Sequence, residues 1–228
     1  MAAIRRLARI ATGFGILLLL AASRASAVCP ENIIFNGCGN DAVGITSTTP
    51  TFSFEEQPWQ AGDPCLLACY DLPHGTIHAR AQGNTASADC NSGVITEDLY
   101  EIVGLAPGPA VPFFAELEVT GSLTGPCSIL AELEELPPGA AASQSVGLPT
   151  PALHFVLHIP LTHATGEQFK IQMSLSALGN FPDGLVDANG VLRFGGLPAG
   201  ASVRSCQTYE LPVPTRPATW GALKSAYR

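Results

Sequence analysis

Apolar and polar residues alternate along much of this chain, which is the period-two pattern of β-strands that bury one face. The longest example covers residues 153–178, where two alternating runs flank the sequence HATG. Folding this segment about Thr165 places Leu161 opposite Phe169 and gathers the large apolar side chains on one face. The pattern predicts a β-hairpin with a single buried face.

Residues 113–134 predict a second hairpin, because apolar residues alternate on both sides of Gly125-Pro126. Further strands, separated by segments rich in Gly and Pro, are predicted at 75–82, 94–103, 190–195 and 201–209. Many short strands joined by such turns are typical of two stacked sheets. The sequence therefore predicts an all-β fold, an antiparallel two-sheet β-sandwich that is jelly-roll-like or Ig-like.

The N-terminus has the features of a secretory signal peptide. Arginines precede the apolar run GFGILLLLAA, and small residues follow at Ala25 and Ala27, so cleavage is predicted near Ala27. The run is shorter than the roughly 20 residues that span a bilayer. We expect a mature chain without a transmembrane segment that is secreted, held at the cell surface or periplasmic.

These features divide the chain into four parts. They are a signal peptide at 1–27, a cysteine-containing segment at 28–73 that joins the sandwich, a sandwich body at 74–211, and a Pro-rich spacer with a basic aromatic tail at 212–228. The tail is predicted to be disordered or a short helix. From Thr219 to Arg228 it forms a frayed end, a strip docked on the acidic sandwich, or a signal read by an export or envelope partner.

The charge of the chain excludes one class of partner. Residues 28–211 carry 4 basic and 19 acidic side chains, a net charge of −15. Such an acidic surface repels a phosphate backbone, so no nucleic acid is expected as a partner.

An exported chain with several cysteines is expected to form disulfide bonds. The candidates are Cys29, Cys38, Cys65, Cys69, Cys90, Cys127 and Cys206. Their spacing selects no full pairing, although Cys29 and Cys38 are close enough in sequence to close a small loop. An odd number leaves one cysteine over, either as a buried free thiol or because Cys29 carries a lipid. Val28 argues against the lipid, since a lipobox has a small residue at that position.

Three segments carry a resemblance to a known group of proteins: GTIHARAQGNTASADC, LYEIVGLAPGPAVPFFAELEVTGSLTG and VLRFGGLPAGASVRSC followed by LPVP. Over residues 70–214 the chain resembles the β-sandwich body of uncharacterised secreted bacterial proteins that often carry a PEP-CTERM sorting tail. The apolar helix and closing Arg cluster of that tail are missing after PVPTRP, so the resemblance implies no sorting of that kind. The final T-W-G-x-x-K-x-x-Y-R is similar to a short tail of exported bacterial proteins.

Four glutamates form the main candidate site. In the predicted hairpin Glu116 lies opposite Glu134, and Glu118 lies opposite Glu132, so four carboxylates share one outer face. A bound Ca²⁺ relieves such repulsion, whereas side chains splayed into water give an ordinary solvated face. Paired carboxylates are also the groups that hydrolyse glycosides.

Asp183, Asp187 and Asn189 form a second candidate Ca²⁺ site within PDGLVDANG, although the spacing of an EF-hand loop is absent. Asn189-Gly190 alternatively predicts a hairpin turn, because both residues tolerate positive φ. The pairs His74/His78 and His154/His158 are each four residues apart, which on a strand is roughly 13 Å. Histidines in such pairs cannot share a metal within one strand, so we interpret them as surface residues.

The sequence shows no nucleophile, zinc-protease or phosphate-loop motif. We therefore predict an exported, disulfide-containing, non-catalytic β-sandwich of the cell surface or extracellular matrix that binds a ligand or Ca²⁺, with no other cofactor. The alternatives are a secreted enzyme, such as a glycan-acting hydrolase, and an envelope subunit anchored through a lipid on Cys29.

Overall fold

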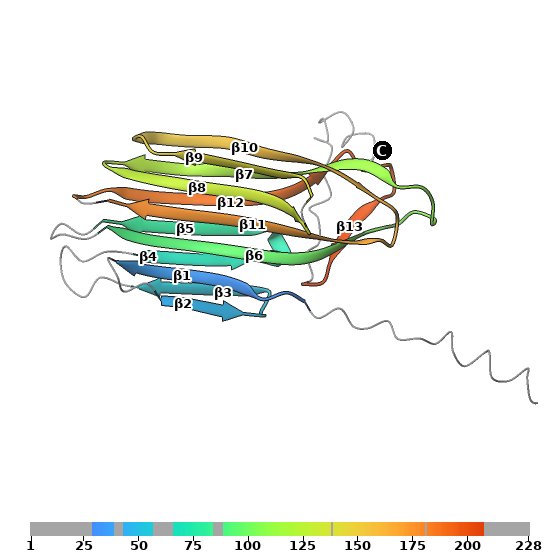
Figure 1. Cartoon of the computed structure of the whole chain (residues 1–228), viewed down its shortest axis with the longest axis horizontal. Helices are drawn as coiled ribbons and strands as arrows, with labels where there is room; N and C mark the ends of the chain where they lie inside the picture. Colours follow the sequence, from blue (N-terminus) through green and yellow to red (C-terminus); the bar gives the residue numbers. More distant parts are fainter. Residues whose placement is uncertain are drawn as a thin grey trace, which may run out of the picture.

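The computed structural model describes residues 29–38, 43–56, 66–83, 89–137, 139–180 and 182–207. These residues form two antiparallel sheets stacked as two layers, which confirms the predicted all-β sandwich (Figure 1). The predicted signal peptide, the C-terminal tail and Cys65 lie outside the described residues. Within those residues, no helix has the length and apolar character needed to cross a membrane.

The first layer, sheet A, has the strand order β2-β1-β6-β11-β8-β9, and β13 also pairs with β6. Its strands are β1 (Asn32–Cys38), β2 (Val43–Ser47), β6 (Cys90–Val103), β8 (Cys127–Leu136), β9 (Ala141–Val146), β11 (Gln168–Gly179) and β13 (Ser202–Ser205). The second layer, sheet B, has the order β10-β7-β12-β5-β4-β3. Its strands are β3 (Thr51–Glu56), β4 (Leu66–Asp71), β5 (Thr76–Gln82), β7 (Val111–Thr124), β10 (Thr150–His163) and β12 (Leu185–Gly195), with the 3-10 turn η1 (Leu72–His74) between β4 and β5.

The core lies between the two layers and follows from the alternation in the sequence. In β7, for example, Ala115, Leu117 and Val119 have no exposed surface, while Glu116 and Glu118 stand between them on the outer face. Opposing sheets of a sandwich are about 10 Å apart, a space that interdigitated apolar side chains fill. One outer face of the protein therefore belongs to sheet A and the other to sheet B.

Both predicted hairpins are wrong in their pairing. β10 pairs with β7 in sheet B, and β11 pairs with β6 and β8 in sheet A, so residues 153–178 cross from one layer to the other. The same holds for residues 113–134, because β7 belongs to sheet B and β8 to sheet A. The alternation is correct in each strand, but the buried faces look at each other across the core instead of lying side by side.

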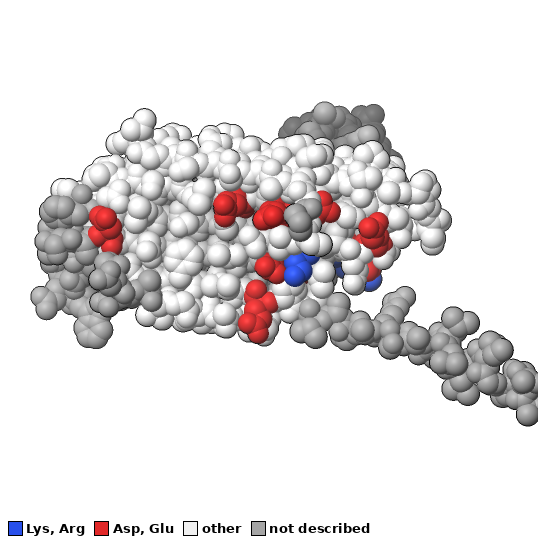
Figure 2. Space-filling model, viewed as in Figure 1, with Lys and Arg blue, Asp and Glu red and all other residues white. Residues whose placement is uncertain are grey.

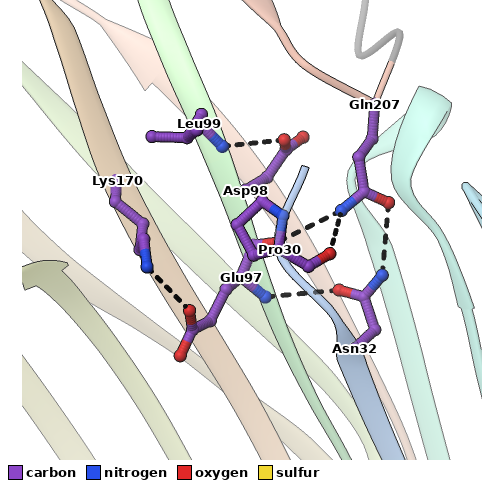
Figure 3. Close-up of polar contacts among 7 residues, drawn as sticks. All are labelled: Pro30, Asn32, Glu97, Asp98, Leu99, Lys170 and Gln207. Atoms are coloured by element: carbon purple, nitrogen blue, oxygen red, sulfur yellow. Dashed lines mark hydrogen bonds and ion pairs between the residues drawn. The ribbon is translucent and has the colours of Figure 1, made fainter. Parts of the chain in front are cut away.

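β1 and β13 lie along the same edge of β6, β1 beside its first half and β13 beside its second. The short gap between them is closed by side chains (Figure 3). The amide oxygen of Asn32 accepts a hydrogen bond from the backbone N–H of Glu97 at 3.3 Å, and the amide nitrogen of Gln207 donates to the carbonyl oxygen of Glu97 at 3.2 Å. Two side-chain amides thus replace the missing backbone partner of β6.

Candidate functional site

The four candidate glutamates do not come together. Glu116 and Glu118 lie on β7, on the outer face of sheet B, whereas Glu132 and Glu134 lie on β8, on the outer face of sheet A. Because the core separates the two faces, one Ca²⁺ cannot bind all four carboxylates, and they form no opposed catalytic pair. The predicted register was wrong since it assumed that β7 and β8 pair.

The second candidate site, the loop from Asp183 to Asn189, is also divided. Asp183 lies in a turn with φ of 59°, while Asp187 and Asn189 lie within β12. The hairpin turn predicted at Asn189-Gly190 is wrong, because Asn189 pairs with His78 on one side and Thr120 on the other. Among the described residues, no group of three or more His, Cys, Asp or Glu side chains is arranged to hold a metal ion.

What the fold does assemble is a charged patch on the outer face of sheet B, which we term the histidine face. Four neighbouring strands, β10, β7, β12 and β5, contribute to it. Its residues are His78, Arg80, Phe114, Glu116, Glu118, His154, His158, Asp187 and Arg193. The prediction that the paired histidines are surface residues agrees with the exposed side chains of His154 and His158.

Two carboxylates of the histidine face are each held by one histidine and one arginine. Glu118 contacts Nε2 of His154 at 3.2 Å and the guanidinium of Arg193. Asp187 contacts Nε2 of His78 at 2.7 Å and Nη1 of Arg80 at 4.0 Å. We call each set an Arg–carboxylate–His unit. Sequence reasoning missed both units because their members come from different strands whose pairing the sequence did not reveal.

The third histidine of this face has a carboxylate and an aromatic neighbour. Nδ1 of His158 lies 3.2 Å from Glu116, and its ring centroid lies 4.7 Å from that of Phe114. The Phe114 ring covers Gly195, the residue opposite it on β12, so closely that a Cβ at Gly195 meets the ring. One side of the ring therefore packs on backbone, which leaves a half-buried aromatic surface next to polar groups.

The cysteines form two disulfide bonds among the described residues, Cys29–Cys206 and Cys38–Cys90. The suggested Cys29–Cys38 loop is therefore wrong. Since the sulfur of Cys29 is bonded to Cys206, a lipid thioether on Cys29 is incompatible with this bond.

Cys69 and Cys127 are free thiols, and burial raises the pKa of both. Asp71 raises the pKa of the Cys69 thiol further. A thiol must ionise to act as a nucleophile, so neither cysteine has the environment of a reactive thiolate.

The gap between β1 and β13 also contains a buried acid. Burial raises the pKa of Asp98 to about 6, although hydrogen bonds from Ser205 and from the backbone of Leu99 and Gln207 oppose this rise. The Leu99 N–H donates to Oδ1 of Asp98 at 2.8 Å (Figure 3). The side chain is 1% exposed. Asp98 is not among the residues that line a hollow on sheet A, so we assign its titration to the pH dependence of stability and not to chemistry.

The hollow on sheet A has a volume of about 210 Å³ and is lined by residues that include Tyr100, Glu101, Gln168 and Arg204. Sites for small molecules usually have about 300–1,000 Å³. By comparison, no described strand covers the outer face of either sheet, and in Figure 2 acidic atoms outnumber basic ones on the visible face. An open face suits an extended ligand better than a small one.

No protein-family model matches the chain, and no curated protein matches its sequence. Among solved structures, TmCBM61 in complex with β-1,4-galactotriose is similar at a TM-score of 0.29 and 11% identity, over 63% of this chain and 87% of that one. The enzymatically active domain of bacteriophage CBA120 tailspike protein 4 is similar at a TM-score of 0.24 and 10% identity, over 73% of this chain and 19% of that one. Likeness at this level does not bear on ligand or activity.

Proposed function

We propose that this protein is an exported, non-catalytic β-sandwich of the cell surface or extracellular matrix that binds a glycan chain on its histidine face. The observation that carries the proposal is the contact of the Phe114 ring with His158, which in turn contacts Glu116, the residue opposite Arg193, so that these groups share three adjacent strands. A sugar ring has an apolar side of C–H groups and a rim of hydroxyls. The Phe114 ring suits the first, and carboxylate, imidazole and guanidinium groups suit the second.

Rigidity supports a binding role for this face. Its side chains project from paired strands, and cross-strand contacts to Glu118 and Glu116 restrict the orientations of His154 and His158 before any ligand arrives. A site on rigid strands loses less conformational entropy on binding than a site on loops. The two disulfide bonds suit an oxidising compartment outside the cytosol, in agreement with the predicted signal peptide and the resemblance to secreted bacterial sandwich proteins.

The proposal is tested by affinity electrophoresis of the exported chain through gels that contain soluble glycan polymers. We expect retardation by at least one polymer, and a loss of about tenfold or more in affinity for Phe114→Ala, because a central aromatic anchor dominates binding. The matched control is Gln172→Ala on the outer face of sheet A, which should bind like the unaltered protein. Equal retardation of Phe114→Ala and Gln172→Ala by every polymer would place the ligand elsewhere.

The same polymers test the secreted-enzyme alternative. A hydrolase releases new reducing ends during incubation, and Glu116→Gln, Glu118→Gln or Glu132→Gln would abolish that release. We expect no release by the unaltered protein, since Glu118 is held by Arg193 and His154, while Glu132 accepts a hydrogen bond from Ser174 on the opposite side of the sandwich. Recognition of the tail from Thr219 to Arg228 by an export or envelope partner remains a separate prediction.

A further inference from the structure

We propose that the glycan bound by the histidine face is acidic, with carboxylate-bearing sugars along its chain, and that protonation of the histidines switches this binding on. This inference rests on the proposed function. It is carried by the two Arg–carboxylate–His units, which give the face a charge that depends on its histidines.

The charge of each unit follows from its members. With a neutral imidazole, the arginine and the carboxylate cancel, so the units built on Glu118 and Asp187 carry no net charge. Imidazole side chains gain a proton in the range from about pH 8 to about pH 5. Each unit then gains one positive charge while its carboxylate stays paired, so the unit attracts an anion that it did not attract before.

The whole face changes sign in the same way. The face carries three negative side chains, on Glu116, Glu118 and Asp187. When its three histidines are neutral, the only positive side chains of the face are its two arginines. When the histidines are protonated, the face carries five positive side chains. Among the described side chains, one further acid lies on a neighbouring strand: Asp71 on β4, paired with His74 at 2.7 Å. Among the residues that the structure describes, the strands of sheet A lie on the opposite side of sheet B, so none of them packs against these groups.

The spacing of the units favours a polymer over a small anion. Asp187 pairs with Ser122 on β7, four residues from Glu118 on the same strand. Four residues of a strand span roughly 13 Å, too far for one carboxylate to touch both units. A chain with repeated carboxylates reaches both, and the second contact then forms at a high effective concentration. The acids on the outer face of sheet A, which include Glu97, Glu101, Glu132 and Glu134, lie across the sandwich, and physiological salt screens charges over about 8 Å.

The probe is polygalacturonate, and its fully methyl-esterified form is the control, with the same backbone and no charge. We expect the exported full chain to bind polygalacturonate at least about tenfold more tightly at pH 5.5 than at pH 8, with no such gain for the ester. The double variant His78→Gln/His154→Gln keeps side chains that donate to the carboxylates but cannot gain charge. It should lose most of the pH dependence, with only the part due to His158 left, while His74→Gln, the same change at a histidine outside the units, should keep it all.

Each of the following outcomes would refute one part of the proposal. Equal binding of the acid and its ester at both pH values would refute the acidic ligand and the switch, while glycan binding itself would stand. Binding of neither polymer, nor of any polymer in the gel series above, would refute the proposed function. Equally tight binding of DNA or of anionic lipid vesicles at pH 5.5 would refute recognition of a glycan, and undiminished pH dependence in the double variant would refute the two units as the switch.

Discussion

The side-chain amides of Asn32 and Gln207 share a hydrogen bond of 3.2 Å, although 175 residues separate them in the chain. Both are buried, and both also bond to the backbone of Glu97. The amide nitrogen of Gln207 donates in addition to the carbonyl oxygen of Pro30 at 3.2 Å. The two ends of the described chain are therefore joined by polar side chains as well as by the Cys29–Cys206 bond.

The first prediction concerns this contact. Asn32→Ala leaves the buried N–H of Glu97 without its acceptor, and an unsatisfied buried group costs about 1–3 kcal/mol of unfolding free energy. Urea denaturation measures the loss. Gln144→Ala, on the exposed edge strand β9, is the control and should change stability by less than about 0.5 kcal/mol. Similar small losses for both variants would show that Asn32 does not hold β1 against β6.

The alternation in the sequence was enough to predict the strands but not the order in which they pair. The alternation predicted that the side chains of Leu161 and Phe169 lie on buried faces, and both are buried in the structure. A turn such as HATG connects two strands equally well within one sheet or across a sandwich, and burial is the same in both. Leu161 pairs with Phe113 and Phe169 with Tyr100, partners far away in sequence.

This ambiguity between pairing within a sheet and pairing across the sandwich is the reason why the predicted glutamate site was wrong. A hairpin of β7 and β8 puts Glu118 beside Glu132, whereas the crossing puts it beside His154 and Arg193. No local signal distinguishes the two arrangements, because charged residues alternate with apolar ones equally well in each. The strands that carry the histidine face were predictable in part, but their neighbours depended on long-range pairing.

The second prediction tests that pairing at Gly190. In β12 a Cβ on Gly190 would lie 2.9 Å from Ile77 and 3.1 Å from Leu117, side chains of the two neighbouring strands. Gly190→Ala should therefore destabilise the protein by about 1–3 kcal/mol in urea denaturation, the usual effect of overpacking. Asn189→Ala, one residue away and exposed, should have little effect. If both residues formed a turn, Asn189→Ala would also be destabilising.

The third prediction concerns the thiols. Alkylation of the unfolded chain without reductant should label Cys69 and Cys127, and peptide mass spectrometry should find Cys29, Cys38, Cys90 and Cys206 labelled only after reduction. In the folded protein at neutral pH, Cys127 should resist labelling and Cys69 should react more slowly than a free thiol, because burial raises both pKa values. A diacylglycerol mass on Cys29 would contradict the Cys29–Cys206 bond and support the lipid anchor.

The fourth prediction follows from the buried acid Asp98, whose pKa rises from an ordinary value of 3.8 to about 6. Below about pH 4 the carboxyl is protonated in both folded and unfolded chains, so it has no effect on the pH dependence of stability. As the pH rises from about 4 to about 6, the unfolded chain loses its proton more readily than the folded one. Ionisation thus favours unfolding, by an amount on the order of 3 kcal/mol above about pH 6.

Asp98→Asn removes this titration. The unfolding free energy of the variant relative to the unaltered protein should therefore rise between about pH 4 and pH 7, whatever its value at pH 4. Urea denaturation of both proteins across this range measures the difference, and comparing them removes the contributions of the histidines and other acids. The neighbouring Glu97→Gln, at a half-buried residue paired with Lys170, is the control and should not show the rise. Parallel curves for Asp98→Asn and the unaltered protein would mean that Asp98 ionises in the folded state as readily as in the unfolded chain.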